Sequence, residues 1–137
     1  MISSYSITNQ DVITDGLINF TTNRILTGCT VTYSPIGQTF QLNKPGYYFI
    51  TFNGVGLPTS TVGEVSIELQ SNGVTVPGTL SAFTPAAVTD TGSVSFSTII
   101  KVAPSCCAMD NRVSLSVVNT GVPTTFTSAN INITKLC

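Results

Sequence analysis

Hydrophobic and polar residues alternate one by one along much of this chain. In residues 64–70, Val65, Ile67 and Leu69 alternate with glutamate, serine and glutamine. Successive side chains of an extended strand point to opposite faces, so this pattern predicts a strand with one buried face and one solvated face. Related patterns predict further strands at residues 16–21, 25–33, 38–42, 46–57, 74–76, 79–83, 93–102, 112–119 and 128–136.

Turn residues separate these strands and keep the connections short. Asn72-Gly73 supplies the two positive φ angles that a type I′ hairpin requires, and Pro77-Gly78 interrupts the strand that returns from it. Because the connections are too short for the crossovers of a parallel sheet, the sheets are predicted to be antiparallel. No segment has a helical period. We therefore predict an all-β, antiparallel two-sheet sandwich of about 8–10 strands.

The 137 residues are enough for one domain with a sizeable core. Residues 1–15 are polar with scattered apolar positions, and they show no sustained alternation. We therefore expect residues 1–15 to be an N-terminal arm or stalk connection and residues 16–137 to be the head domain.

The strand at residues 46–57 is apolar on both faces. A second sheet covers only one face of a strand, and monomers rarely leave a large apolar patch in water. The pattern therefore predicts that another copy of the chain covers the other face. An ordinary sandwich strand with a partly exposed aromatic face is the alternative, and which face meets the second copy stays open. The bulky residues divide between the faces, with Tyr47 and Phe49 on one and Tyr48, Ile50 and Phe52 on the other.

Charged residues make up only 8% of the chain, and five basic and six acidic residues give a net charge of −1. This composition is typical of an extracellular or particle-bound protein, or of one that hides surface between subunits, rather than of a charge-solvated cytosolic enzyme. The basic residues form no stripe along the sequence. Nucleic acid is therefore not expected as a partner.

The sequence shows neither a membrane span nor a signal peptide. No apolar run reaches the ~18 residues of a spanning helix. The start, Met1-Ile2-Ser3-Ser4, lacks the basic and apolar regions of a signal sequence. We expect an extracellular location or the surface of a virion or spore, reached by cell lysis, particle assembly or a longer parent chain.

Catalytic chemistry has little to build on in this chain. There is no histidine to act as the base of a nucleophilic triad. Glu64 and Glu68 share a strand face, but at about 13 Å apart they are too distant for an acid–base pair. We expect no enzymatic activity and assign no catalytic residue.

The four cysteines leave their chemistry open. Cys29, Cys106, Cys107 and Cys137 fit small buried or loop thiols, two disulfides, or a soft-metal site. Adjacent cysteines without histidine do not have the usual spacing of a zinc site. We assign no metal ligand, and the disulfide state stays undetermined.

Calcium is the one cofactor for which a site can be suggested. It prefers clustered carboxylate and carbonyl oxygens, and Asp110-Asn111 could supply two of them. A turn formed by these two residues is the commoner explanation. We therefore expect no cofactor, with calcium as the minor alternative.

The order of the motifs resembles a known superfamily. A Pro-Gly-Tyr-Tyr strand at residues 45–52 is followed by a strand that ends in Asn-Gly and Val-Pro-Gly, at residues 69–78. A Ser/Phe/Ile strand leads to a cysteine-bearing turn, and Leu-Ser-Val-Val-Asn and Ala-Asn-Ile-Asn-Ile-Thr-Lys-Leu strands complete the chain. Residues 16–136 thus resemble the globular heads of complement component 1q and tumour necrosis factor proteins. The bacterial and phage versions are most similar, such as the C-terminal heads of collagen-like exosporium glycoproteins.

This resemblance implies a ten-stranded jelly roll that forms a tight homotrimer. It places the tyrosine-rich strand and the terminal strand in the inner sheet, near the three-fold axis. The serine face of residues 93–101 and the Asn/Thr face of the last strand are consistent with hydrogen bonding between subunits. No Gly-X-Y stalk is present, which leaves the tether open. The candidate interface residues are Tyr47, Tyr48, Phe49, Ile50, Phe52, Ile99, Asn132 and Leu136.

Two functions follow as hypotheses. The first is a structural head that homotrimerises and caps an upstream fibre, stalk or particle surface. The second is a tip that binds a host protein receptor or surface glycan through the loops at residues 58–63, 84–92 and 121–127. These loops contain few aromatic residues, which argues against stacking on sugar rings.

Overall fold

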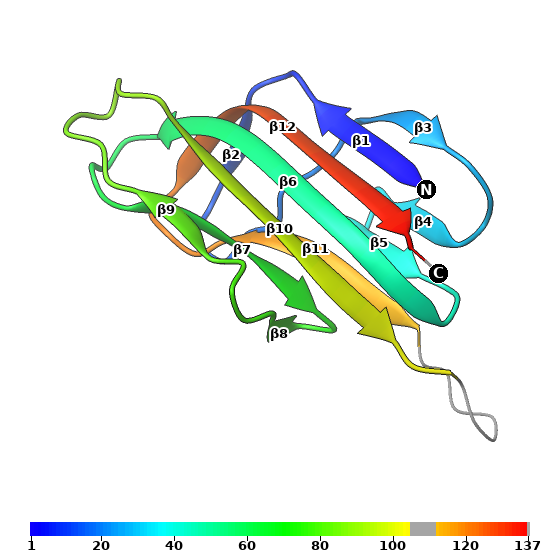
Figure 1. Cartoon of the computed structure of the whole chain (residues 1–137). Helices are drawn as coiled ribbons and strands as arrows, with labels where there is room; N and C mark the ends of the chain where they lie inside the picture. Colours follow the sequence, from blue (N-terminus) through cyan, green and yellow to red (C-terminus); the bar gives the residue numbers. More distant parts are fainter. Residues whose placement is uncertain (105–111, 137) are drawn as a thin grey trace.

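The computed structural model describes residues 1–104 and 112–136, and this part of the chain forms two antiparallel sheets packed face to face (Figure 1). The first six strands are β1 (Ile2–Ser6), β2 (Gln10–Val12), β3 (Thr22–Leu26), β4 (Val31–Ser34), β5 (Thr39–Leu42) and β6 (Gly46–Pro58). The other six are β7 (Val65–Ser71), β8 (Val74–Thr75), β9 (Ser81–Phe83), β10 (Gly92–Val102), β11 (Val113–Asn119) and β12 (Thr124–Lys135).

Each sheet contains six strands. Sheet A has the order β10-β6-β12-β1-β3, and β2 also pairs with β12. Sheet B has the order β4-β5-β11-β7-β8, and β9 also pairs with β7. Strands far apart in sequence lie side by side in both sheets, as in a jelly roll. The described residues include no helix that is long and apolar enough to cross a membrane.

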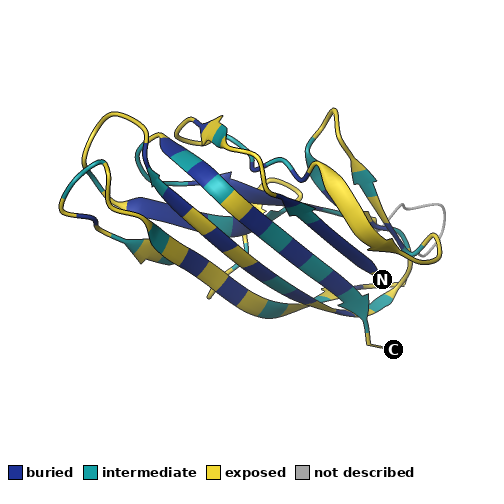
Figure 2. Cartoon of the chain, turned by 90° about the horizontal axis from the view of Figure 1, so that it is seen from above, coloured by how far each residue is buried: buried dark blue, intermediate teal, exposed yellow. Residues whose placement is uncertain are grey.

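Alternation along β6 decides which of its faces belongs to the core. Tyr48, Ile50 and Phe52 are fully buried between the sheets, whereas Tyr47 and Phe49 remain 45% and 40% exposed. Figure 2 shows the same alternation as dark-blue and yellow bands along the long strands. The sequence left this choice open, and the structure resolves it.

An aromatic cluster joins the two sheets inside the sandwich. The ring of Phe20 lies 5.4 Å from that of Phe40 in sheet B and 6.2 Å from that of Phe52 in sheet A, both edge to face. Tyr33 completes the cluster, with its ring centroid 4.5 Å from that of Phe40. Its hydroxyl donates to Asn19 Oδ1 and accepts from the backbone N–H of Phe20. The cluster therefore fixes the segment before β3 against both sheets.

The predicted N-terminal arm is wrong as a description of the first residues. Strand β1 lies inside sheet A, where it pairs with β12 on one side and β3 on the other. Ile2 is fully buried, and so is Ser4, whose hydroxyl donates to Asn23 Oδ1. Two of the inward positions, Ser4 and Ser6, are serines, so the apolar alternation that marks other strands is missing here.

Residues 16–21 were predicted to form a strand, and this was also wrong. Ile18 and Phe20 are buried alternately, as the pattern requires. The segment nevertheless makes only an isolated bridge, Leu17 to Val118, and is otherwise extended without a neighbouring strand. In this segment the alternation of apolar and polar residues therefore indicates that one side is buried, and it does not indicate that the segment belongs to a sheet.

The other predicted strands are present, with shifted ends. Residues 25–33, predicted as one irregular strand, are divided between β3 and β4, and Gly28 has a positive φ of 72° in the loop between them. The hairpin at Asn72-Gly73 has φ angles of 51° and 81°, as predicted for a type I′ turn. Inward-facing Val65, Ile67 and Leu69 are fully buried. Ser66, which was expected to face water, is only 2% exposed, and its hydroxyl shares a hydrogen bond with that of Thr120.

Opposite charges collect at opposite ends of the strands. Lys101 and Lys135 pair with the first tyrosines of β6, at the end that also carries both chain termini (Figure 1). Asp11 pairs with Thr125 at the far end of β12, and Asp90 lies just before β10 at that same end. We call the first the termini end and the second the loop end.

Candidate subunit interface

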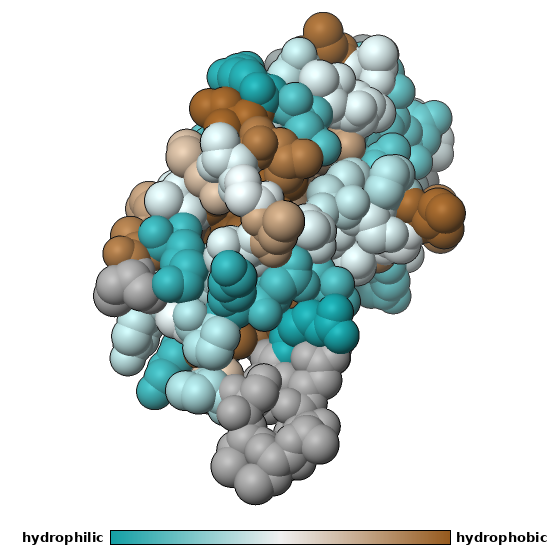
Figure 3. Space-filling model, turned by 90° about the vertical axis from the view of Figure 1, so that its right-hand side faces the viewer, coloured by the Kyte–Doolittle hydropathy of each residue, from teal (hydrophilic) through white to brown (hydrophobic). Residues whose placement is uncertain are grey.

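The outer face of sheet A, which points away from the sandwich core, differs from an ordinary solvated sheet surface. Near the termini end it carries the exposed rings of Tyr47 and Phe49, and Ile99 lies beside Phe49 on β10 with 57% of its side chain exposed. The Lys101 ammonium lies 5.9 Å from the Tyr47 ring centroid, within reach of a cation–π contact. Figure 3 views the molecule from this end and shows hydrophobic side chains in several separate places, among them the upper left, the top and the right edge of the view.

Sheet B provides the comparison. Its outward positions include Gln41 on β5 and Glu68 on β7, and the Glu68 carboxylate accepts hydrogen bonds from Gln70 and Thr75. Val118 is 3% exposed and pairs with Leu17 of the extended segment before β3, whereas Val74, on the short edge strand β8, is 69% exposed. Sheet B therefore exposes mainly polar groups along β5 and β7, with Val74 at its edge, whereas Tyr47, Phe49 and Ile99 of sheet A lie together on two neighbouring strands.

Two successive rows of side chains cross the middle of the outer face of sheet A, and both are polar. The first row consists of Ser97, Thr51, Asn132 and Ser3, on β10, β6, β12 and β1 in turn. The second consists of Ser95, Asn53, Asn130 and Tyr5 on the same strands. We call them the Thr51 row and the Asn53 row. Neither row contains a charged side chain, but the Arg24 guanidinium lies 5.0 Å from the Tyr5 ring centroid at the β3 edge.

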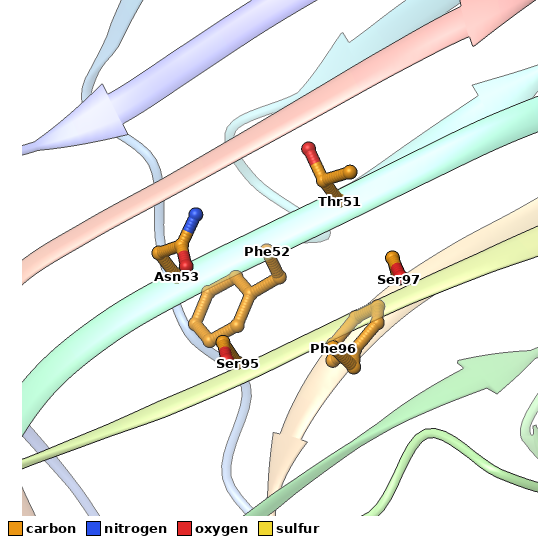
Figure 4. Close-up of a pocket in the computed structure, with 6 residues that line it drawn as sticks. All are labelled: Thr51, Phe52, Asn53, Ser95, Phe96 and Ser97. Atoms are coloured by element: carbon orange, nitrogen blue, oxygen red, sulfur yellow. The ribbon is translucent and has the colours of Figure 1, made fainter.

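A hollow of about 400 Å³ lies between β6 and β10 where these rows meet. The rings of Phe52 and Phe96 stack beside it, with centroids 5.5 Å apart and planes 20° from parallel. Figure 4 shows these rings together with the polar side chains of both strands. The residues that line the hollow are Thr51, Phe52, Asn53, Ser95, Phe96 and Ser97.

The two asparagines of β12 on this face, Asn132 and Asn130, differ in the hydrogen bonds of their side-chain amides. The Asn132 amide donates to Thr51 Oγ1 at 3.4 Å. Asn130 Oδ1 is buried but accepts no hydrogen bond, and among the described residues it is the only buried side-chain polar atom without a partner. A buried acceptor left unpaired costs about 1–3 kcal/mol. The Asn53 row therefore contains one unmet acceptor.

The structure divides the predicted interface residues into two groups. Tyr48, Ile50 and Phe52 are wholly buried within one chain, so their assignment to the interface is wrong. Their side chains alternate inward because the strand has a period of two. Tyr48 also donates a hydrogen bond from its hydroxyl to the Lys44 carbonyl, and burial raises its pKa. The other five stay predictions and have accessible surface on the outer side of sheet A or at its end: Tyr47, Phe49, Ile99, Asn132 and Leu136.

Sequence reasoning missed the individual importance of Asn53, Asn130 and Tyr5. The register of the sheet brings them into one row, although they come from three strands far apart in the chain. The signal available beforehand was a set of uncharged polar residues at outward positions of strands whose inward positions are apolar. Tyr5 could not be found in this way, because β1 itself was not recognised.

The remaining predicted features are only partly within the described residues. Cys29 is an exposed thiol in the loop between β3 and β4. Cys106, Cys107 and Cys137 and the Asp110-Asn111 pair lie outside the described residues, so the disulfide and calcium alternatives stay as predicted. Within the described residues, no three His, Cys, Asp or Glu side chains gather to hold a metal ion.

Two of the three loops of the predicted receptor-binding tip, at residues 58–63 and 121–127, are joined by hydrogen bonds at the loop end, and residues 84–91 lie at that same end (Figure 1). The Thr59 backbone N–H donates to the Pro123 carbonyl, and Thr59 and Thr125 share a hydroxyl hydrogen bond of 3.1 Å. Val122 N–H donates to the Glu64 carbonyl and fixes the two neighbouring loops.

Comparison with known proteins shows likeness in structure rather than in sequence. No protein-family model matches the chain, and no curated protein matches its sequence. The globular domain of zebrafish complement 1qA protein is 10% identical with a TM-score of 0.73, over 99% of this chain and 96% of that one. Eiger TNF from S. frugiperda is 12% identical with a TM-score of 0.70, over 99% and 92%. PRD1 vertex protein P5 is 18% identical with a TM-score of 0.59, over 99% and 96%.

These matches cover the whole sandwich, including β1 and the loops of both ends. At such low identities they establish the fold and not the activity. They confirm the resemblance drawn from the order of the strand motifs. The chain has the jelly-roll fold of complement component 1q and tumour necrosis factor domains.

Proposed function

We propose that this chain is a non-enzymatic structural head that assembles as a homotrimer through the outer face of sheet A. In this role it caps a fibre, stalk or particle surface outside cells, such as a virion or a spore. The observation that carries the proposal is the apolar strip of Tyr47, Phe49 and Ile99, which lies exposed on the outer face of sheet A among the described residues. The fold supports it, because the superfamily that the sequence resembles uses this sheet for trimer contacts.

The size of the apolar strip is suited to a stable contact. Aromatic side chains bury about 200 Å² each, so exposures of 45% and 40% leave about 170 Å² of Tyr47 and Phe49 open on each chain. At ~25 cal/mol per Å², covering this area contributes about 4 kcal/mol per subunit. Ile99, at 57% exposure, adds to the same strip.

The oligomeric state tests the proposal directly. Sedimentation equilibrium over a dilution series should give a mass three times that of the 14.4 kDa chain. A single monomeric mass at all concentrations would refute the proposed homotrimer. Replacing Ile99 with Ser should weaken the trimer, whereas replacing outward-facing Gln41 of sheet B with Ser serves as the matched control.

The capping role needs its own experiment. Fused after a collagen-like (Gly-Pro-Pro) repeat, a trimeric head should hold three chains in register and raise the melting temperature of the triple helix. The Ile99→Ser head should raise it less. Equal melting with and without the head would count against capping while leaving trimerisation intact.

A receptor-binding tip is the second proposed function. It is favoured by the hydrogen bonds that hold residues 59 and 123–125 together at the loop end, away from both termini. Such a position would present the loops to a protein receptor or surface glycan. A glycan array and a cell-binding assay with the trimer test it, and binding should be lost when residues 84–91 are replaced by a Gly-Ser linker of equal length.

A further inference from the structure

We propose that Arg24 of one subunit enters the hollow between β6 and β10 of the next subunit, where its guanidinium donates to hydroxyl and amide oxygens of the lining. This inference rests on the proposed homotrimer and identifies which parts of two neighbouring chains meet in it. It starts from the placement of the two features on sheet A, with Arg24 on the edge strand β3 and the hollow beside the opposite edge strand, β10.

A β-bulge places Arg24 on the outer face of sheet A. The pairing of β1 with β3 shifts register between Ser3 and Ser4, and Arg24 is the extra residue of β3 at this shift. Bulges commonly re-aim a side chain, and here the Arg24 guanidinium lies 5.0 Å from the Tyr5 ring centroid. Contact with a ring leaves the five N–H donors of a guanidinium available for oxygen acceptors. Arg24 is exposed and can therefore donate to acceptors of another chain.

A three-fold axis brings the two edges of sheet A together. Both termini lie at one end of the strands, so three chains joined to one upstream fibre or stalk have their strands running roughly along the axis (Figure 1). Rotation by 120° about this axis carries the β3 edge of each subunit to the β10 edge of the next and leaves the height of every residue along the axis unchanged. The contact is therefore heterologous, since a different surface lies on each side of it, and it closes after three copies.

The sheet register puts Arg24 at the height of the hollow. The bulge that contains it falls between the Thr51 row and the Asn53 row, and residues of these same two rows line the hollow. Ile25, which is 38% exposed, lies at the β3 end of the Thr51 row. The apolar strip begins one outward row away with Ile99, so the same rotation brings Ile25 toward the strip of the next subunit.

The lining of the hollow fits a guanidinium. Its polar groups are the hydroxyls of Thr51, Ser95 and Ser97 and the amide of Asn53, and each of them offers an oxygen acceptor. None of its lining residues is charged, so nothing in the hollow repels a cation. The planar fork of an arginine can reach several such acceptors at once, and hydrogen bonds from a charged donor are stronger than neutral ones.

Disulfide trapping tests the contact and its symmetry. Arg24 and Ser95 lie on the two edge strands of sheet A, four strand spacings or about 19 Å apart in one chain. A disulfide needs Cα atoms within about 7 Å, so a chain with both Arg24→Cys and Ser95→Cys can form this link only between subunits. Complete oxidation should give covalent trimers on a non-reducing denaturing gel. The two single-cysteine variants are the controls for links made by native thiols such as exposed Cys29.

Two results of the trapping experiment would overturn the inference. The first is the absence of covalent trimers beyond those of the single-cysteine controls. The second is linkage that stops at dimers, which is the product of a two-fold contact.

A double-mutant cycle tests the hydrogen bonds without introduced cysteines. Arg24→Met keeps the length of the side chain but removes its donors, so it should weaken association about tenfold per contact in sedimentation equilibrium. Ser95→Ala should also weaken association, but it should have no further effect in the Arg24→Met background. Lys44→Met is the matched control, because it removes an exposed cation from the loop before β6, and it should leave the dissociation constant unchanged.

The outcome of the cycle separates this inference from the proposed function. Equal dissociation constants for the wild type and Arg24→Met would overturn the inference, and the trimer itself would stand. A wild type that is monomeric at every concentration would instead remove the proposed function first, and the inference with it.

Discussion

The neighbouring residues Tyr48 and Phe49 give the sharpest test of which face of β6 stabilises the fold and which face takes part in assembly. Tyr48 is 0% exposed and its hydroxyl donates to the Lys44 carbonyl at 2.6 Å, whereas Phe49 is 40% exposed on the outer face. Replacing each separately with serine removes an aromatic ring of similar size from positions one residue apart. The two variants should fail in different ways.

The Tyr48→Ser substitution should lower the free energy of unfolding. Uncovering about 200 Å² of buried ring costs about 5 kcal/mol at ~25 cal/mol per Å², and the lost hydrogen bond adds about 1 kcal/mol. This is a large share of the 5–15 kcal/mol that stabilises a typical domain, so Tyr48→Ser should be largely unfolded or melt far below the wild type. Urea titration followed by far-ultraviolet circular dichroism measures the change.

The Phe49→Ser substitution should mainly weaken the association of subunits. Within one chain, Phe49→Ser costs about 1 kcal/mol through weaker strand pairing. Covering the 40% of the ring that stays exposed contributes about 2 kcal/mol per subunit, so association should weaken about thirtyfold per contact. Sedimentation should then show folded monomers at concentrations where the wild type is assembled. The reasoning is refuted if Phe49→Ser unfolds the chain while Tyr48→Ser leaves the unfolding midpoint unchanged.

Three further predictions test the fold. Deleting residues 1–6 should abolish folding, because it removes the strand between β12 and β3; soluble protein with native circular dichroism would contradict this. Burial raises the pKa of Tyr33 and Tyr48, so the stability that they contribute is complete below about pH 10 and lost as pH rises through their folded values; urea midpoints at pH 8 to 11 should fall, and a flat profile would count against it. Gly73→Ala, at φ 81° with open space around it, should cost about 1 kcal/mol, whereas the Cβ of Gly121→Ala would collide with the Glu64 carbonyl and cost more than about 3 kcal/mol; equal melting temperatures would argue against this difference.

The regular strands of this fold could be predicted because their inward residues are large and apolar. Residues 64–70 show this, since Val65, Ile67 and Leu69 are both the pattern and the core. Strand β1 could not be found in this way because two of its inward positions are serines. Their burial depends on neighbours such as Asn23, which only the folded register brings close.

The candidate site was predictable only in outline. The pattern showed that β6 is apolar on both faces, but a period of two is the same whichever face points inward. Only the packing of Phe52 against Phe20 and Phe96 assigns Tyr48 to the core and Phe49 to the outer face. The unmet acceptor of Asn130 had no sequence signal, because it depends on which donors the tertiary structure leaves out of reach.

The segregation of lysines and acids along the strands has a consequence for how the molecule approaches a surface. With Lys101 and Lys135 at one end and Asp11 and Asp90 at the other, each head is an electric dipole aligned with its strands. Near an anionic membrane or resin, the field turns the lysine-bearing end inward before contact, over a range of about 10 Å at 0.1 M salt. The head would therefore land upright, with its loops pointing outward.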